Sequence, residues 1–374
     1  MKDITILTDV QGEVIGEKLV DPKYPWKERK LKTFKLARLY EVAGWPDYAT
    51  RTATCSTWLQ YLAMEDGMRQ LHAANFCKLR LCPLCIARRA KQSAYQLSQV
   101  MDKVQLDHPS VMYLFLTLTV RNCPGDQLGD TLGRLTKAWK SLIDQRQIQR
   151  SIKGWFRAIE ITRNKDDGTY HPHIHAILAV EPGYFARKSG EYITHKEWVR
   201  RWRLALKADY DPSVRIQTTK AKGELCAGRA AAEEAAKYAT KDSDYIDSDL
   251  PEWMAADIVD TYTRALRRRR LTAFGGWLKE AAAALGTEDL EDGDLVHLDQ
   301  DTIRADVAEL IEDYGWHFGA GDYVLTSRRV NPLRVTRAEG DTPPAAPGRP
   351  PENEEGERPS GASAGRRENR EPPR

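Results

Sequence analysis

The chain has 374 residues, of which 41% are hydrophobic, and a formal net charge of +3. This length accommodates one large domain or two modest ones, and the hydrophobic fraction supports a buried core. The longest apolar runs are far too short to cross a bilayer and no secretory signal opens the chain. We therefore expect a cytoplasmic protein with reduced cysteines and no membrane partner.

Residues 1–50 form a basic lead-in without a recognisable motif. Its cations gather in one stretch, at Lys27, Arg29, Lys30, Lys32, Lys35 and Arg38. Such a stretch can neutralise DNA phosphates, with a contribution that falls as salt rises. A solvated helix face is the more usual explanation for a charge run taken alone.

Residues 51–100 form a cysteine-rich segment that is expected to bind a structural zinc ion. Cys82 and Cys85 form a Cys-x-x-Cys arrangement, and Cys77 lies just upstream. Cys55 can supply the fourth sulfur, with His72 as an alternative. Four soft ligands at this spacing suit a closed tetrahedral zinc site, although unrelated reduced thiols would give the same pattern.

Residues 101–250 alternate between strand and helix patterns and are expected to form the core. Strands are predicted at 113–120, 155–162, 171–175 and 214–218, and helices at 127–149 and 196–207. The turn-forming residues 164–169 join the second and third strands into a hairpin. The pattern predicts an α+β fold with a central antiparallel sheet that carries helices on one side and leaves the other face open.

Three of the eight histidines lie within five residues, at His171, His173 and His175. Because side chains alternate along a strand, His173 and His175 leave the sheet on the same side. Glu160 on the preceding strand can lie beside them, with His171 as the alternative third ligand. Two imidazoles and one carboxylate suit Mn²⁺ or Mg²⁺ in a phosphoryl-transfer site, and could also hold zinc or iron. The simpler alternative is a pair of edge histidines beside a surface glutamate.

Residues 230–241 are rich in alanine and glutamate and predict a helix. Glu234, Tyr238 and Lys241 share one face of it. A tyrosine phenol can attack a phosphodiester when a nearby cation holds the substrate, and a glutamate one turn away can serve as a general base. Tyr245 is the rival nucleophile. Taken alone, the pattern is also that of a solvated helix with a Glu-Tyr contact.

Two further regions invite a DNA-binding interpretation. Trp198 and Trp202 alternate with arginines and could stack unpaired bases, but tryptophans at this spacing are as often core. Residues 251–339 contain the basic run 267–270 and look helical and then hairpin-like, which is compatible with a winged-helix appendage. Residues 340–374 lose large apolar side chains in favour of Pro, Gly, Glu and Arg, and should be disordered.

Together these motifs resemble the HUH endonuclease superfamily, in particular the plasmid rolling-circle replication initiators (Rep) that pair a tyrosine with a glutamate. The resemblance rests on His173-Ile174-His175, the helical Glu-x-x-x-Tyr-x-x-Lys pattern and the strand at 113–120, in that order. It runs from about Cys55 to about Val296. The Cys-Pro-x-Cys segment followed by Arg88-Arg89 is also similar to the amino-terminal part of many of these initiators.

The resemblance implies that the sheet is the palm of a metal-dependent nickase. Tyr238 would cut one DNA strand at the origin and stay joined to the 5′ phosphate, while Glu234 would activate water to end the cycle. His173 and His175 would be metal ligands, and Glu160 is less certain because related enzymes differ there. The DNA partner would be a single-stranded or hairpin origin and adjoining duplex. Because the chain has no P-loop, a host helicase and a polymerase would have to follow the nick.

Three other classes of protein share part of this pattern. A conjugative relaxase or a single-strand transposase is the nearest, but many relaxases place the tyrosine before the histidines, and here it follows them. A non-haem iron oxygenase typically uses His-x-Asp/Glu with a distant second histidine. A non-enzymatic zinc-dependent nucleic-acid-binding protein would leave the histidines and the tyrosine helix unexplained.

Overall fold

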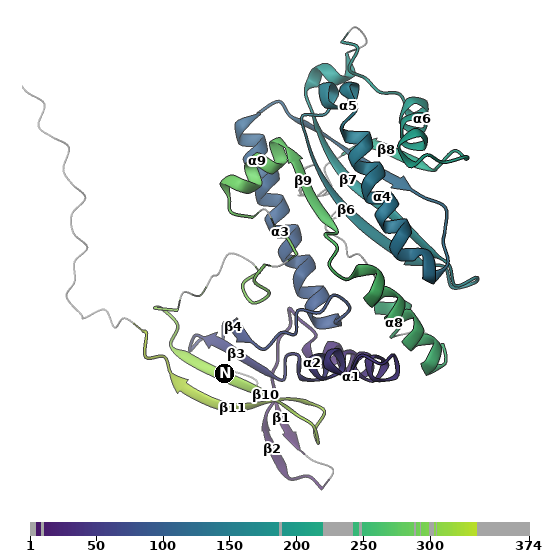
Figure 1. Ribbon diagram of the computed structural model, residues 1–374. Helices are drawn as coiled ribbons and strands as arrows, with labels where there is room; N and C mark the ends of the chain where they lie inside the picture. Colours follow the sequence, from purple (N-terminus) through teal and green to yellow (C-terminus); the bar gives the residue numbers. More distant parts are fainter. Residues whose placement is uncertain are drawn as a thin grey trace, which may run out of the picture. The chain divides into compact units, whose positions relative to one another are not determined.

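The computed structural model contains a five-stranded antiparallel sheet, termed the central sheet (Figure 1). Its strands are β5 (Met112–Thr119), β6 (Gly154–Arg163), β7 (Tyr170–Val180), β8 (Val214–Thr218) and β9 (Thr272–Gly276). They follow the order β8-β5-β7-β6-β9. The turn between β6 and β7 contains Gly168 at φ +71°, a left-handed conformation that favours glycine. The α+β class and the antiparallel sheet expected from the sequence are confirmed.

The structure describes residues 5–8, 11–186, 189–219, 242–246, 249–287, 289–291, 293–298, 303 and 305–334. All of these belong to one unit, Met1–Arg334. Among them, no helix has the length and apolar character needed to span a membrane.

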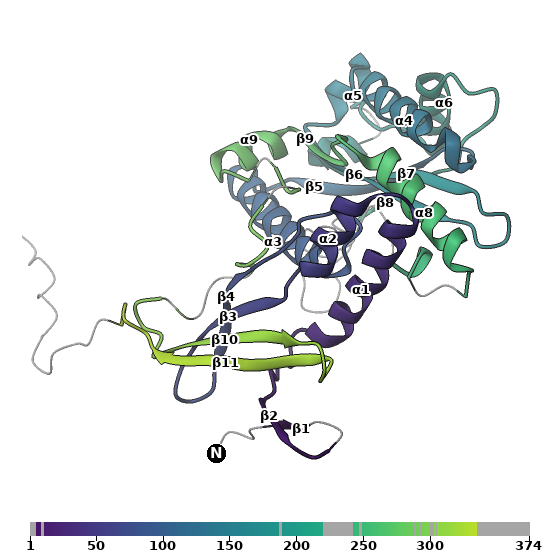
Figure 2. The same cartoon turned by 60° about the horizontal axis from the view of Figure 1, so that its bottom comes forward.

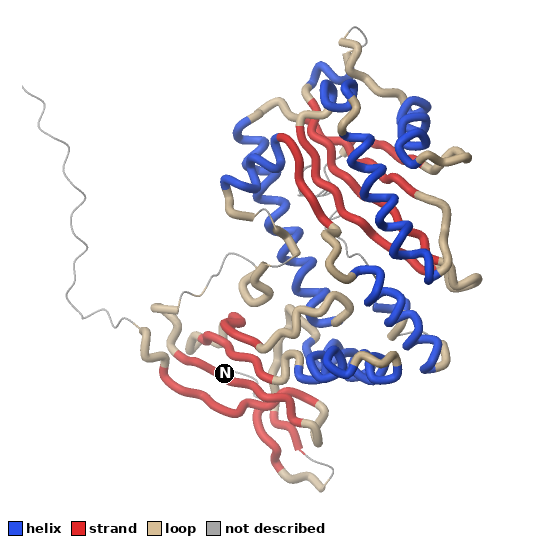
Figure 3. The backbone as a smooth tube through the Cα atoms, in the orientation of Figure 1, coloured by secondary structure: helices blue, strands red, loops and turns tan. Residues whose placement is uncertain are grey.

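Helices cover both faces of the central sheet (Figures 1 and 3). One face packs against α4 (Leu128–Ile143), α6 (His195–Leu206) and α8 (Glu252–Leu266), with α5 (Arg146–Ser151) beside them. The other packs against α3 (Pro83–Asp107) and α9 (Trp277–Ala284). The expectation of helices on one side is therefore wrong. The sequence carries the reason, because the end of β7 is an unbroken apolar run, which is typical of a strand buried on both faces.

A second antiparallel sheet combines strands from opposite ends of the chain (Figure 2). It contains β3 (Trp58–Ala63), β4 (Arg69–Ala74), β10 (Leu310–His317) and β11 (Asp322–Val330), in the order β11-β10-β3-β4. The fully buried Glu312 on β10 accepts from Arg69 Nε at 2.6 Å and from Arg328 Nε at 2.8 Å, and so links β4 to β11. Each charge is paired, as burial requires.

The segment boundaries drawn from the sequence do not match this arrangement. The hairpin β10–β11 pairs with β3 from the cysteine-rich segment instead of forming a winged-helix appendage, and β9 from the same region is an edge strand of the central sheet. The lead-in is structured as well. It contains β1 (Ile6–Thr8), β2 (Val14–Glu17), α1 (Trp26–Val42) and the start of α2 (Pro46–Thr54).

Most helix predictions hold within a few residues. The helix expected at 127–149 is α4 followed by α5, with a break between them, and the helix near 196–207 is α6. Thr194 caps α6 by accepting a hydrogen bond from the Glu197 amide at 3.2 Å. Short 3₁₀ turns occupy Gly125–Gln127, Pro182–Phe185 and Asp242–Asp244. The tail at 340–374 lies outside the described residues.

Candidate functional site

Glu160, His173 and His175 converge on one face of the central sheet. Glu160 on β6 is directly opposite His173 on β7 in the strand register, and His175 is opposite Ala158. Glu160 Oε2 lies 2.9 Å from His175 Nε2 and 3.4 Å from His173 Nε2. Ligand atoms about 2.1 Å from one cation and at right angles to each other are about 3 Å apart, so these residues fit a shared metal ion. The three side chains are largely buried.

The far nitrogens of both imidazoles are tied to the sheet. His173 Nδ1 is 3.1 Å from the carbonyl oxygen of His171, to which it can only donate. The lone pair of a neutral His173 therefore lies on Nε2, the atom that faces Glu160. His175 Nδ1 is 3.2 Å from Thr117 Oγ1 on β5. Such outer contacts fix ring orientation in metal sites.

His171 is not part of this group. Its Nδ1 is 2.7 Å from Asn122 Oδ1, and the Asn122 amide donates to Thr169 Oγ1 at 2.9 Å. Burial and the nearby His173 lower the pKa of His171. Of the two alternatives for a third ligand, the geometry brings Glu160 to the pair and holds His171 away from it.

The electrostatics of Glu160 favour its charged form. Burial by itself would raise the pKa of this carboxyl, but its close contacts with the imidazoles of His173 and His175 outweigh burial and hold the pKa well below its ordinary value. A buried carboxylate that stays ionised beside two imidazoles carries a negative charge that a divalent cation can neutralise.

Arg215 on β8 lies on the same face as the histidines. It is opposite Thr117, which is itself opposite His175, so these side chains form one row across β8, β5 and β7. Arg215 is exposed and donates to Gln217 Oε1 at 3.2 Å. No carboxylate pairs with it in the part of the chain that the structure describes. Arg215 could not be predicted from the sequence, because alternation within one strand does not show which strands are neighbours.

The four predicted cysteine ligands also come together. Cys55, Cys77, Cys82 and Cys85 form one group, with Sγ–Sγ distances of 3.7 Å for Cys55–Cys85 and 3.6 Å for both Cys77–Cys85 and Cys82–Cys55. Sulfur atoms about 2.3 Å from a tetrahedral zinc ion are about 3.8 Å apart, so the thiols fit that ion. His72 instead stacks edge-on against His297, with ring centres 6.2 Å apart.

The cysteine group also has the electrostatics of a cation site. Hydrogen bonds from the neighbouring thiols lower the pKa of Cys77, whereas burial raises the pKa of Cys82 well above its usual value. Lys30 Nζ donates to the carbonyls of Ala53 and Cys55 at 2.7 and 2.6 Å, and burial lowers its pKa to about 8.

We expect Cys82→Ala to lower the free energy of unfolding by about 4 kcal/mol or more, the range typical of a lost structural metal. Denaturant unfolding and the zinc content of the purified protein measure the effect. Cys123→Ala is the matched control, because Cys123 is buried outside the group and should cost only about 1 kcal/mol. Equal losses in both variants, with zinc retained in Cys82→Ala, would contradict a metal role.

Three further predicted catalytic residues come from the segment 230–241. Glu234, Tyr238 and Lys241 all lie outside the described residues. The rival nucleophile Tyr245 is fully buried, and its hydroxyl donates to the Leu81 carbonyl at 2.7 Å. Burial raises its pKa well above the ordinary value, so this phenol is unsuited to attack a substrate.

The tryptophans proposed as stacking surfaces are core residues. Trp198 and Trp202 have no exposed surface, and Trp202 Nε1 donates to the Thr119 carbonyl at 2.8 Å. Both pack between α6 and the sheet, which excludes base stacking. The basic lead-in is partly structural too, because Lys30 is buried.

Comparison with known proteins identifies the family. The family described as "Replication protein" matches residues 68–324. A "Protein rep" of Streptococcus pneumoniae serotype 2 (strain D39 / NCTC 7466) is 36% identical over 277 residues, which cover 74% of this chain and 84% of the relative. A "Protein rep" of Lactiplantibacillus plantarum is 33% identical over 320 residues, 84% of this chain and 99% of the relative. A "Replication protein" of Staphylococcus aureus is 35% identical over 208 residues, 55% of this chain and 87% of the relative. No solved structure matches the chain.

The chain therefore belongs to this family of replication proteins. The class expected from the sequence, a plasmid replication initiator, is confirmed.

Proposed function

We propose that this protein starts rolling-circle replication by nicking one strand of its plasmid origin and later rejoining it, as a nickase of the HUH type. The observation that carries the proposal is the convergence of Glu160, His173 and His175 on one sheet face in a replication protein. The sequence adds a tyrosine on a predicted helix downstream of that sheet. Its partners would be origin DNA and a host helicase and polymerase.

The nicking step is an in-line displacement at phosphorus. The Tyr238 oxygen bonds to phosphorus as the bond from phosphorus to the 3′ oxygen breaks. The phenol loses its proton and the 3′ oxygen gains one, which leaves a 3′ hydroxyl to prime synthesis and a 5′-phosphotyrosine. This covalent bond allows the strand to be rejoined after a round of synthesis.

The side chains at the site would hold Mn²⁺ or Mg²⁺, and the cysteine group would hold Zn²⁺. When bound, the divalent ion would offset the charge that builds on the phosphate oxygens during displacement. The His171 carbonyl and the Thr117 hydroxyl would hold the two imidazoles in the orientation that metal ligands need, with Nε2 toward Glu160, which limits the reorganisation needed during the reaction. Lys241 would hold a substrate phosphate.

The test uses a labelled single-stranded oligonucleotide that carries the origin sequence. We expect wild-type protein to form a covalent adduct on a denaturing gel with Mn²⁺ or Mg²⁺ and none with a chelator. Oxygen consumption is measured in parallel. A protein that binds the oligonucleotide but never forms an adduct would contradict the proposal, and consumption of dioxygen would favour the oxygenase alternative.

Glu234→Ala should separate the two halves of the cycle. Without its general base, hydrolytic release at termination should slow by about 100-fold, whereas the first nick, made by Tyr238, should be nearly unchanged. Single-turnover rates of nicking and of adduct hydrolysis measure the two steps, with Glu233→Ala as control. Loss of the first nick in Glu234→Ala alone would contradict this division of labour.

Arg215→Ala should lower kcat/KM for nicking by roughly 10-fold to 100-fold, because a charged hydrogen bond to a substrate phosphate is worth about 1.5–3 kcal/mol. Arg215→Lys should recover part of the activity. Arg203→Ala is a control, since Arg203 is an exposed arginine that pairs with Asp211 at 3.0 Å. An unchanged kcat/KM in Arg215→Ala would remove this residue from the site.

A further inference from the structure

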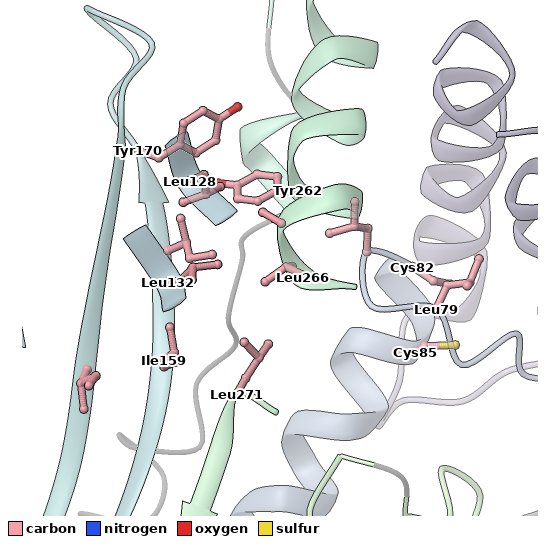
Figure 4. Packing of buried hydrophobic residues seen from close by; sticks show 14 of the residues in the cluster. Leu79, Cys82, Cys85, Leu128, Leu132, Ile159, Tyr170, Tyr262, Leu266 and Leu271 are labelled. Atoms are coloured by element: carbon pink, nitrogen blue, oxygen red, sulfur yellow. The ribbon is translucent and has the colours of Figure 1, made fainter. Parts of the chain in front are cut away.

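A pocket of about 340 Å³ lies between the loop from Cys77 to Cys82 and the C-terminal end of α8. Hydrophobic side chains connect the two walls: Tyr262 and Leu266 of α8 belong to the same buried cluster as Leu79 and Cys82 of the loop (Figure 4). The pocket includes neither the Glu160, His173 and His175 side chains nor the cysteine ligands, and the proposed nicking reaction assigns it no role.

The lining of this pocket is strongly basic. Lys78, Arg267 and Arg268 are exposed and have no carboxylate partner among the described residues. Arg80 also lines the pocket but is neutralised by Glu291, whose Oε2 is 2.7 Å from Arg80 Nη2. No aspartate or glutamate is among the lining residues. Three cations from segments nearly 190 positions apart thus share one cavity that the described residues line without a carboxylate.

The backbone in both walls of the pocket adopts unusual conformations at these cations. Lys78 and Arg268 adopt left-handed conformations, with φ of +59° and +55°, which are unfavourable for residues other than glycine. The loops are tied to their surroundings, because Arg80 Nη2 donates to the Arg269 carbonyl at 2.6 Å and Arg51 Nη2 donates to the Cys77 carbonyl at 2.8 Å. Strained backbone that the surrounding structure holds in place often marks a binding site.

A purely structural explanation accounts for only part of the cluster. Arg267 and Arg268 follow the last turn of α8, where the helix dipole favours cations. The helix dipole does not explain the position of Lys78. This residue comes from the opposite wall of the pocket and adds a third positive charge beside Arg267 and Arg268. Tyr40, Tyr48 and Tyr262 contribute rings to the walls. The volume is at the low end of that for small-ligand sites and exceeds that of a bare phosphate.

We propose that this pocket binds a phosphodiester of the DNA backbone. The inference rests on the proposed function only for the choice of DNA as the polyanion. Leu271, three residues after Arg268, accepts a hydrogen bond from the Ile159 amide at 2.9 Å, and Ile159 precedes Glu160. Three residues span at most about 10 Å, so Arg268 lies near the backbone of the strand that carries Glu160. The cysteine group gains a second role, because it shapes the loop that carries Lys78.

The test is a binding measurement that needs no catalysis. The pocket variant is Lys78→Asn, Arg267→Gln and Arg268→Asn in the full chain, with asparagine chosen because it tolerates left-handed backbone. The control is Arg146→Gln, Lys196→Gln and Lys279→Gln, three exposed cations on α5, α6 and α9. Both carry the same change in charge, and thermal unfolding checks that both fold. Fluorescence anisotropy with a duplex and a single-stranded oligonucleotide gives affinity over a range of salt concentrations.

We expect the pocket variant to bind DNA about 10-fold more weakly and to lose about one unit of the slope of log K against log salt, the value for one phosphate contact. If the affinity falls for only one of the two DNAs, that DNA, duplex or single strand, is the source of the phosphate. Unchanged affinity for both DNAs, or equal losses in pocket and control variants, would each overturn the proposal. Failure of wild-type protein to nick would instead overturn the proposed function and leave this result intact.

Discussion

Tyr238→Phe is expected to abolish the covalent DNA adduct and to slow nicking by at least about 10⁴-fold. The phenylalanine ring keeps the shape of the side chain but has no oxygen to bond to phosphorus, so the loss reports on chemistry and not on folding. A denaturing gel of protein with labelled origin oligonucleotide detects the adduct, and anisotropy shows whether DNA binding persists.

Tyr245→Phe is the matched control for this prediction. Its hydroxyl is buried against the Leu81 carbonyl, so its removal should cost stability without affecting the adduct. An adduct that persists in Tyr238→Phe and disappears in Tyr245→Phe would reverse the assignment of the nucleophile.

His175→Ala should lower the rate of nicking by roughly 1000-fold, because loss of a metal ligand removes several kcal/mol of charge stabilisation in the transition state. The same substitution should weaken binding of Mn²⁺, which calorimetric titration measures without any DNA. The Glu160 carboxylate would then keep only His173 as a partner within the group.

His171→Ala distinguishes a ligand from a neighbour. His171 contacts Asn122 and not the Glu160 group, so this variant should retain Mn²⁺ affinity and most of its activity. If His171→Ala loses Mn²⁺ as completely as His175→Ala, the ion sits further along β7 than we propose.

The local geometry of the site could be predicted because it depends on neighbouring parts of the chain. Alternation along β7 placed His173 and His175 on one side, and the short turn at 164–169 brought Glu160 opposite His173. The four cysteines were likewise found from their spacing. In each case the deciding interactions lie within one hairpin or between segments near in sequence.

Pairing between strands that are distant in the chain could not be predicted from the sequence. Nothing in residues 58–63 indicates that their partner strand is about 250 positions away, so the cysteine-rich segment and the C-terminal hairpin were placed in separate segments. Arg215 was overlooked for the same reason. Trp198 and Trp202 were ambiguous, because a tryptophan on an amphipathic helix can either pack against a sheet or stack on a base. The sequence pattern is the same in both cases.

The pairing of β3 with β10 has a consequence for the timing of synthesis. Chains grow from the amino terminus at about 5–20 residues per second, so β3 must wait more than ten seconds at that rate for its partner strand to leave the ribosome. During this interval one edge of the β3–β4 hairpin is unpaired, and Glu312 has not yet been made to neutralise Arg69. A newly made initiator should therefore mature only after β10 and β11 emerge, which delays its first action in replication.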